Sequence, residues 1–226
     1  MKCALLLPGH MRHYKNTFSN QSKTIIDPNE CDIFISTSNL ITSWIKPHEY
    51  VAEEKDVEIL EEEIRSVYGD KLKGLIINPE ENLDVIPSPL QWKRLKECFK
   101  QKTLYEKENN FNYDVILRGR ADLVYSRPLK ITEERIEDNK VSLIKHFDSR
   151  KIPIHDQFAY GHPDSMEQYC NLIDVFISRE KGDNRSWAEV GGRSEDQLYR
   201  WLKKQNIEID YMENFYFKMI RRYECK

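Results

Sequence analysis

Cys3-Ala4-Leu5-Leu6-Leu7, followed at once by Pro8-Gly9, opens the chain with an apolar run that stops at a turn. An apolar run bounded by turn residues is typical of a buried strand that is covered on both faces. Residues 14–26 have helical spacing, and a second apolar run follows them, Cys31-Asp32-Ile33-Phe34-Ile35-Ser36. Together these segments predict a β-α-β unit with a right-handed crossover.

The rest of the chain continues this alternation of strands and helices. Helical spacing is found at 53–67, 90–110, 163–178 and 194–204, and strand-like runs at 72–78, 113–118, 123–125, 141–146, 155–161 and within 207–222. Polar stretches with Pro or Gly at 79–89 and 180–193 indicate loops. The pattern predicts an α/β fold, with an open, mostly parallel sheet covered by helices on both faces.

Composition limits the possible classes of protein. The 226 residues suit one domain spanning 1–226, and 35 basic against 38 acidic side chains give no basic excess, which argues against a nucleic-acid partner. The five cysteines are scattered without a CxxC pair, which argues against zinc and favours a reducing compartment. No signal peptide and no apolar run of about 20 residues is visible. We therefore expect a cytoplasmic protein without a transmembrane segment.

Ligands of open α/β sheets bind beyond the carboxyl ends of the strands, which directs attention to the loops 8–13, 36–44, 118–122 and 155–162. The first loop contains Pro8-Gly9-His10-Met11-Arg12. Gly9 permits a tight turn and a close approach of the backbone to a ligand, and Arg12 suits a phosphate. The alternative is an ordinary surface turn with an exposed arginine.

The third strong strand leads into a second charged loop, Arg118-Gly119-Arg120-Ala121-Asp122. If the strand continues, Arg118 and Arg120 point to the same side and make one face cationic. Asp122 offers the hard oxygen ligand that a divalent cation with a diphosphate needs. The alternative is an Arg–Asp ion pair on the surface, which contributes little to stability.

Three further positions are candidates for chemistry or binding. Asp156, in His155-Asp156-Gln157, is a candidate general base, or else it holds a turn. Glu195 at the start of a helix competes for the same role, although acids there commonly serve the helix dipole. Gln91 and Trp92 open the long helix, where a tryptophan stacks on a ligand ring or, more commonly, belongs to the core.

Motifs of several large enzyme classes are absent. The sequence contains no GxxxxGK[ST], GxGxxG, HExxH or GxSxG pattern. Their absence argues against a P-loop enzyme, a dinucleotide-binding enzyme of the usual type, a zincin and an α/β-hydrolase.

The order of the motifs resembles that of glycosyltransferase-like proteins found in bacterial polysaccharide clusters and large DNA viruses, akin to WavE-type lipopolysaccharide proteins. The resemblance spans nearly the whole chain. It rests on Gly9-x-x-Arg12, the strand Cys31 to Thr37, the helix led by Gln91, Tyr113-Asp114-x-Ile116-x-Arg118-x-Arg120-x-Asp122, Asp156-x-Phe158-x-x-Gly161 and Ser194-Glu195-x-x-Leu198.

The resemblance implies a GT-A-like, nucleotide-sugar-binding fold. Arg120-Ala121-Asp122 stands where such enzymes carry an Asp-x-Asp metal motif, and the first acid of that motif is here an arginine. Either Asp122 helps to hold Mn²⁺ or Mg²⁺, or the arginines neutralise the leaving diphosphate without metal.

The function expected from this reading is glycosyl transfer from a nucleoside-diphosphate sugar to a hydroxyl of a glycan or other acceptor. Donor binding would fall to Pro8, Gly9, His10, Arg12, Gln91, Arg118, Arg120 and Asp122, metal binding to Asp122, and catalysis to Asp156 or Glu195. The alternatives are a non-catalytic module that binds a nucleotide sugar or carbohydrate, and a sugar nucleotidyltransferase.

Overall fold

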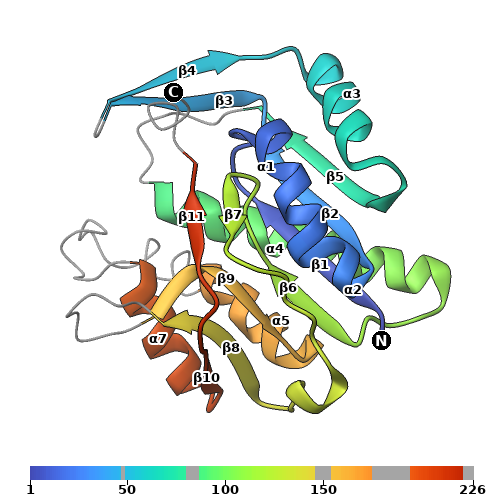
Figure 1. Ribbon diagram of the computed structural model, residues 1–226, viewed down its shortest axis with the longest axis vertical. Coiled ribbons are helices and arrows are strands. Elements are labelled where there is room, and N and C mark those ends of the chain that lie inside the picture. The colour runs from blue at the N-terminus through green and yellow to red at the C-terminus, as the bar shows by residue number, and fades with distance from the viewer. Residues whose placement is uncertain (47–48, 80–86, 146–153, 175–193, 221–226) are drawn as a thin grey trace.

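The computed structural model describes residues 1–46, 49–79, 87–145, 154–174 and 194–220 (Figure 1). The strands are β1 (Cys3–Pro8), β2 (Cys31–Ser38), β3 (Leu40–Lys46), β4 (Glu49–Glu54), β5 (Leu72–Asn78), β6 (Val115–Arg118), β7 (Leu123–Tyr125), β8 (Lys140–Lys145), β9 (Ile154–Gly161), β10 (Glu208–Met212) and β11 (Phe217–Met219). The main helices are α1 (Tyr14–Gln21), α3 (Val57–Tyr68), α4 (Pro87–Asn109), α5 (Pro163–Cys170) and α7 (Ser194–Lys204).

Seven strands form the central sheet, in the order β10-β8-β9-β6-β1-β2-β5. β1 pairs in parallel with β2 and β6, β2 with β5, and β10 with β8, whereas β9 runs antiparallel to both of its neighbours. The sheet is therefore mixed and mostly parallel, as the sequence predicts. This architecture is Rossmann-like and consistent with a GT-A-like fold.

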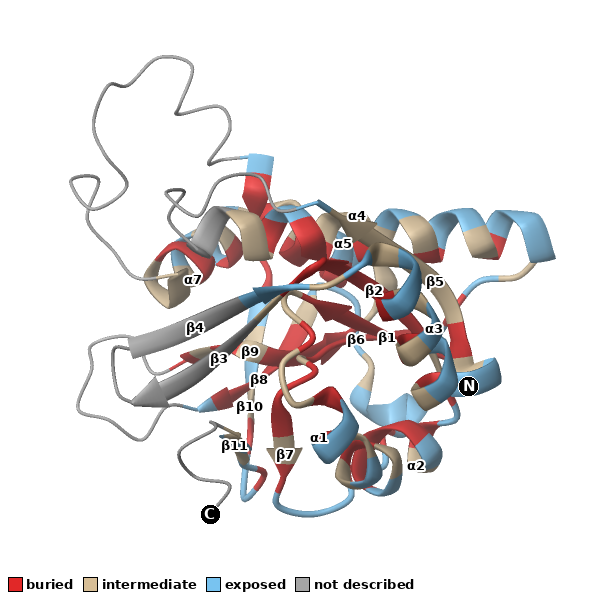
Figure 2. Cartoon of the chain, turned by 90° about the horizontal axis from the view of Figure 1, so that it is seen from above, coloured by how far each residue is buried: buried red, intermediate tan, exposed pale blue. Residues whose placement is uncertain are grey.

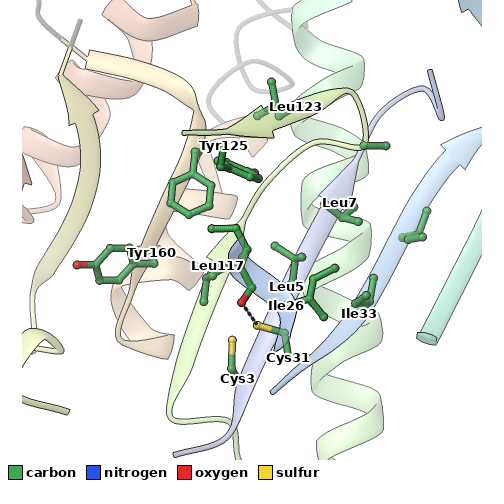
Figure 3. Packing of buried hydrophobic residues seen from close by; sticks show 14 of the residues in the cluster. Cys3, Leu5, Leu7, Ile26, Cys31, Ile33, Leu117, Leu123, Tyr125 and Tyr160 are labelled. Atoms are coloured by element: carbon green, nitrogen blue, oxygen red, sulfur yellow. Dashed lines mark hydrogen bonds between the residues drawn. The ribbon is translucent and has the colours of Figure 1, made fainter. Parts of the chain in front are cut away.

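Helices cover both faces of the sheet, with α1 and α3 on one side and α4, α5 and α7 on the other (Figure 2). Alternate residues of β1 enter the two cores, because successive strand side chains point to opposite faces. Cys3, Leu5 and Leu7 lie beside Ile33 of β2 (Figure 3). Buried side chains of α1 and α3 belong to the same core. Ala4 and Leu6 pack beneath α4.

The long helix α4 follows from its sequence. Proline is compatible with the first turn of a helix, where its missing N–H would have no partner, and α4 begins at Pro87. Trp92, Leu95 and Cys98 recur at a spacing of three, and all three are buried. This apolar stripe lays α4 across β1, β2 and β5.

The structure differs from the prediction around two loops. The expected loop at 36–44 is instead the end of β2 followed by β3, which pairs with β4 in an antiparallel hairpin. β7 leaves the main sheet and pairs with β11, forming a ribbon that brings the C-terminal part of the chain over the 118–122 loop. Hydrophobic period and strand propensity are properties of a local stretch of sequence, so they do not reveal which strands pair. The predicted loop at 180–193 lies outside the described residues.

Two smaller differences concern helices. The segment predicted as one helix over 14–26 is α1 followed by a short π-helical stretch, η1 (Ser22–Ile26), and by α2 (Asp27–Asn29). Helix α5 ends at Cys170, earlier than the predicted 178, and the described chain continues only to Asp174. Within the described residues, no helix is long and apolar enough to cross a membrane.

Candidate functional site

The turn after β1 is built around Gly9. Its backbone φ is +105°, in the region that favours glycine, and its N–H donates to the carbonyl of Ser36 at 2.9 Å. Pro8 ends β1, and Nδ1 of His10 lies 2.8 Å from the carbonyl oxygen of Leu40. The predicted tight turn is thus confirmed, and it fixes the start of the segment that carries Arg12.

Helix α1 holds the loop at 120–123 from below. Nε2 of Gln21 donates to the carbonyl oxygens of Arg120, Ala121 and Leu123, at 3.0, 3.1 and 2.8 Å. The hydroxyl of Thr17 also donates to the carbonyl of Ala121. Both side chains are buried, so these bonds to backbone carbonyls fix the shape of the loop strongly.

This loop joins Arg12 and Arg120 on one carboxylate. Arg120 binds Asp122 in fork geometry, with Nε to Oδ1 at 2.9 Å and Nη2 to Oδ2 at 2.8 Å. Nε of Arg12 lies 3.5 Å from the same Oδ2. The side chain of Asp122 is only 2% exposed, against 15% for Arg12 and 13% for Arg120. The turns after β1 and β6 therefore converge on a buried Arg–Asp–Arg group.

The charges in this group hold each other ionised. Burial by itself would raise the pKa of Asp122, but the nearby charges of Arg120 and Arg12 outweigh burial and lower that pKa. Burial would likewise lower the pKa of Arg120, but Asp122, and after it Asp156, raise it. The effect of Asp156 on Arg120 shows that the two charged clusters are electrostatic neighbours.

Arg118 and Arg120 have separate contacts, although the sequence suggested that they share one cationic face. β6 ends at Arg118, so the alternation on which that expectation depends stops there. The guanidinium of Arg118 is fully buried and lies 5.7 Å from the ring centre of Trp92. Arg120 instead approaches the sulfur of Met219, at 4.0 Å. Residue spacing could not reveal this separation, because it follows from the end of the strand.

The guanidinium of Arg118 has no hydrogen-bond acceptor among the described residues. Its Nε, Nη1 and Nη2 are all buried without a partner. Stacking on Trp92 compensates the buried charge only in part. Buried polar groups are nearly always hydrogen-bonded, so a fully buried cation with three unpartnered nitrogens is a candidate position for an anion.

Asp156 is the centre of the second cluster. Its Oδ2 accepts from the hydroxyl of Ser194 at 2.7 Å and from Nε2 of Gln91 at 3.1 Å. The hydroxyl of Ser194 in turn accepts from Nε1 of Trp92 at 3.0 Å, and Tyr169 donates its hydroxyl to the Asp156 carbonyl. Both of these side-chain bonds end on Oδ2 and fix the orientation of the carboxylate.

Strand pairing explains how these residues meet. β9 runs antiparallel to β6 with Ala159 opposite Arg118, so Asp156, near the start of β9, lies beyond the carboxyl end of β6. Trp92 contacts both Arg118 and Ser194, and so connects the unpaired cation to the Asp156 cluster. Sequence reasoning named Ser194 only as part of the motif that opens the late helix, and missed its contact with Asp156.

Glu195 follows Ser194 in the first turn of α7. Burial raises the pKa of Tyr169, Arg118 lowers it, and Asp156 and Glu195 raise it further. Glu195 therefore lies in the same electrostatic environment as Asp156. Trp92 is a core residue, as its position on a helix favours, and it carries a polar contact at its indole nitrogen.

The donor set at Asp122 does not fit a divalent cation. Both carboxylate oxygens are already bound by Arg120, and a second arginine lies beside them. In the described part of the chain, no three His, Cys, Asp or Glu side chains gather as metal ligands would. A hard cation needs several oxygen ligands, and this site presents guanidinium groups instead.

The chain resembles solved structures but matches no protein-family model. No protein-family model matches it, and no curated protein matches it significantly. Among solved structures, the chain is similar to the apo form of the glycosyltransferase GlyE from Streptococcus pneumoniae TIGR4, with a TM-score of 0.46 and 9% sequence identity. That match covers 92% of this chain and 44% of the other, so the chain spans less than half the length of this neighbour.

Proposed function

We propose that the chain is a glycosyltransferase that moves a sugar from a nucleoside-diphosphate sugar to an acceptor hydroxyl. The observation that carries this proposal is the buried guanidinium of Arg118, which has no acceptor among the described residues and stacks on Trp92. It ends a parallel strand, the place where open α/β sheets bind ligands. An anionic group of the substrate supplies the missing acceptor.

The neighbouring residues suit a diphosphate donor rather than a simple anion. Arg12 and Arg120 lie at the adjacent turns and are partly exposed, so their guanidinium groups are within reach of a second phosphate. Gly9 lets the backbone turn close to this point. Arginine groups that face the bridging and terminal oxygens stabilise the charge that develops on the leaving diphosphate.

Asp156 is the proposed general base. Ser194 and Gln91 hold its Oδ2, which orients the carboxylate. In the transfer, the acceptor hydroxyl gives its proton to Asp156, and its oxygen bonds to the anomeric carbon. The bond between that carbon and the diphosphate breaks, and the electron pair leaves with the diphosphate. Glu195 is the competing base.

The test combines donor binding with turnover. UDP-, GDP-, dTDP- and CMP-sugars are screened by thermal shift, since a ligand that binds the folded state raises the apparent stability. Hydrolysis and transfer are then measured for the chain and for Arg12→Ala, Asp122→Ala and Asp156→Ala. We expect Asp156→Ala to lower turnover by about 10²- to 10⁴-fold.

Several outcomes would reject the proposal. Wild-type turnover in all three variants would remove the assigned roles. Binding of a donor without hydrolysis or transfer to any acceptor would indicate a binding module. Turnover of a nucleoside triphosphate with a sugar phosphate would indicate a nucleotidyltransferase. A comparison of Asp156→Ala with Glu195→Ala decides which carboxylate is the base.

A further inference from the structure

We infer that this site works without a divalent metal, with arginine side chains taking the place of the cation; the inference rests on the proposed function. Glycosyltransferases with an Asp-x-Asp motif would place a metal at the position of Arg120-Ala121-Asp122, which is the expectation that the resemblance raised. The contacts of Asp122 oppose it.

The contacts of Asp122 make it a poor ligand for a metal ion. Nε and Nη2 of Arg120 take Oδ1 and Oδ2 at 2.9 and 2.8 Å, which is a complete fork-to-carboxylate pair. The remaining side of Oδ2 faces Nε of Arg12 at 3.5 Å. The carboxylate is also 2% exposed, so water molecules that would complete the shell of Mg²⁺ or Mn²⁺ have no room beside it.

Asp156, the other carboxylate that acts on the charge of Arg120, does not turn Asp122 into a metal site. Its Oδ2 already accepts from Ser194 and Gln91. A metal held by Asp122 and Asp156 together would lie beside the guanidinium groups of Arg120 and Arg12. The metal cation and the guanidinium groups would repel each other strongly at short range in a buried site, so metal binding would be weakened.

Arginine meets the same chemical need directly. A guanidinium is always charged and presents a planar fork of N–H donors that matches phosphate oxygens. The guanidinium of Arg118 has no hydrogen-bond acceptor among the described residues. The guanidinium groups of Arg12 and Arg120 are partly exposed. A metal in Asp-x-Asp enzymes neutralises the diphosphate as one concentrated charge, whereas here the positive charge is spread over three side chains.

The experiment measures nucleotide binding and metal binding separately. The chain is freed of metal with EDTA, and UDP, GDP and dTDP are titrated by calorimetry in EDTA and in Mn²⁺. We expect the Kd of the preferred nucleotide to agree within about twofold between the two conditions, because no metal bridges the diphosphate to Asp122. Mn²⁺ alone, followed by its electron paramagnetic resonance signal, should show no saturable site on the free chain.

Substitution of Arg120 provides a gain-of-dependence test. Arg120→Asp restores the first acid of an Asp-x-Asp pair and removes the fork on Asp122. We expect it to lose nucleotide binding in EDTA and to gain Mn²⁺ binding. Arg135→Asp, the same change at an exposed arginine, is the matched control and should leave both unchanged. If Arg120→Asp does not fold, Arg12→Gln replaces it and should weaken nucleotide binding in EDTA about tenfold or more.

The outcomes separate this inference from the proposed function. Nucleotide binding that requires Mn²⁺ would overturn the inference and leave glycosyl transfer standing. A saturable Mn²⁺ site on the free chain would overturn it as well. Failure of every nucleotide to bind in both conditions would reject the proposed function, and the inference with it.

Discussion

Replacement of Arg118 by methionine should make the protein more stable while it abolishes donor binding. The guanidinium is fully buried, and its three nitrogens have no acceptor among the described residues. The effective cost of burying an ion is several kcal/mol, and a desolvated cation–π contact such as that with Trp92 returns about 2 kcal/mol. Methionine has a similar length and no charge to desolvate.

The expected gain is about 2 kcal/mol in the free energy of unfolding, within the range of about 1–4 kcal/mol found when buried ions are replaced by apolar groups. For a chain of this length, that corresponds to a rise in Tm of about 4–8 °C. Urea denaturation and differential scanning calorimetry measure the two quantities. Arg65→Met, on the exposed face of α3, is the control and should change stability by less than about 0.5 kcal/mol.

The physical reasoning would be refuted if Arg118→Met lowered the Tm while Arg65→Met did not. That result would show that Arg118 holds the fold together through a partner and is not prepared for a ligand. A stabilised variant that still binds the nucleotide with unchanged affinity would instead refute the assignment of Arg118 to the donor. Gain of stability together with loss of binding is the pattern of a site that stores strain for function.

Four other predictions concern Asp122, Ser194 and Gly161. Asp122→Asn leaves two partly buried arginines without their anion and should lower the free energy of unfolding by about 3–5 kcal/mol, read from urea midpoints. The folded-state pKa of Asp122 lies below its usual value near 4. Its contribution to the free energy of unfolding is therefore present above about pH 4 and is lost as the pH falls through the folded pKa. Acid titration of the stability of Asp122→Asn and of the parent chain measures this loss. Ser194→Ala should lower kcat more than it changes KM, since Asp156 loses a donor that orients its carboxylate. Ser194→Thr should restore kcat, and an unchanged kcat in Ser194→Ala would contradict this role. Gly161→Ala should cost about 1–3 kcal/mol, because its Cβ would lie 2.8 Å from the carbonyl of Lys140 on the neighbouring strand, and an unchanged denaturation midpoint would contradict this packing.

Much of the secondary structure could be predicted from local pattern. The apolar runs at Cys3–Leu7 and Cys31–Ser36 are strands, and the spacing of Trp92, Leu95 and Cys98 places α4 on the sheet. Burial of alternate or every third side chain leaves a period in the sequence, so these elements are readable from it. The β3–β4 hairpin and the pairing of β7 with β11 were not predicted, because a local sequence pattern does not reveal which strands pair.

For the candidate site, too, the sequence identified the residues and the tertiary structure set their contacts. By itself the sequence determined which charged residues follow the strands, among them Arg12, Arg118 and Asp122, because strand ends can be recognised locally. Only the tertiary structure decided their partners: Arg120 turns back onto Asp122, Arg118 enters the core under Trp92, and Ser194 reaches Asp156. The reason is physical, since the end of β6 and the antiparallel pairing of β9 set the direction of each side chain, and both depend on contacts between residues distant in sequence.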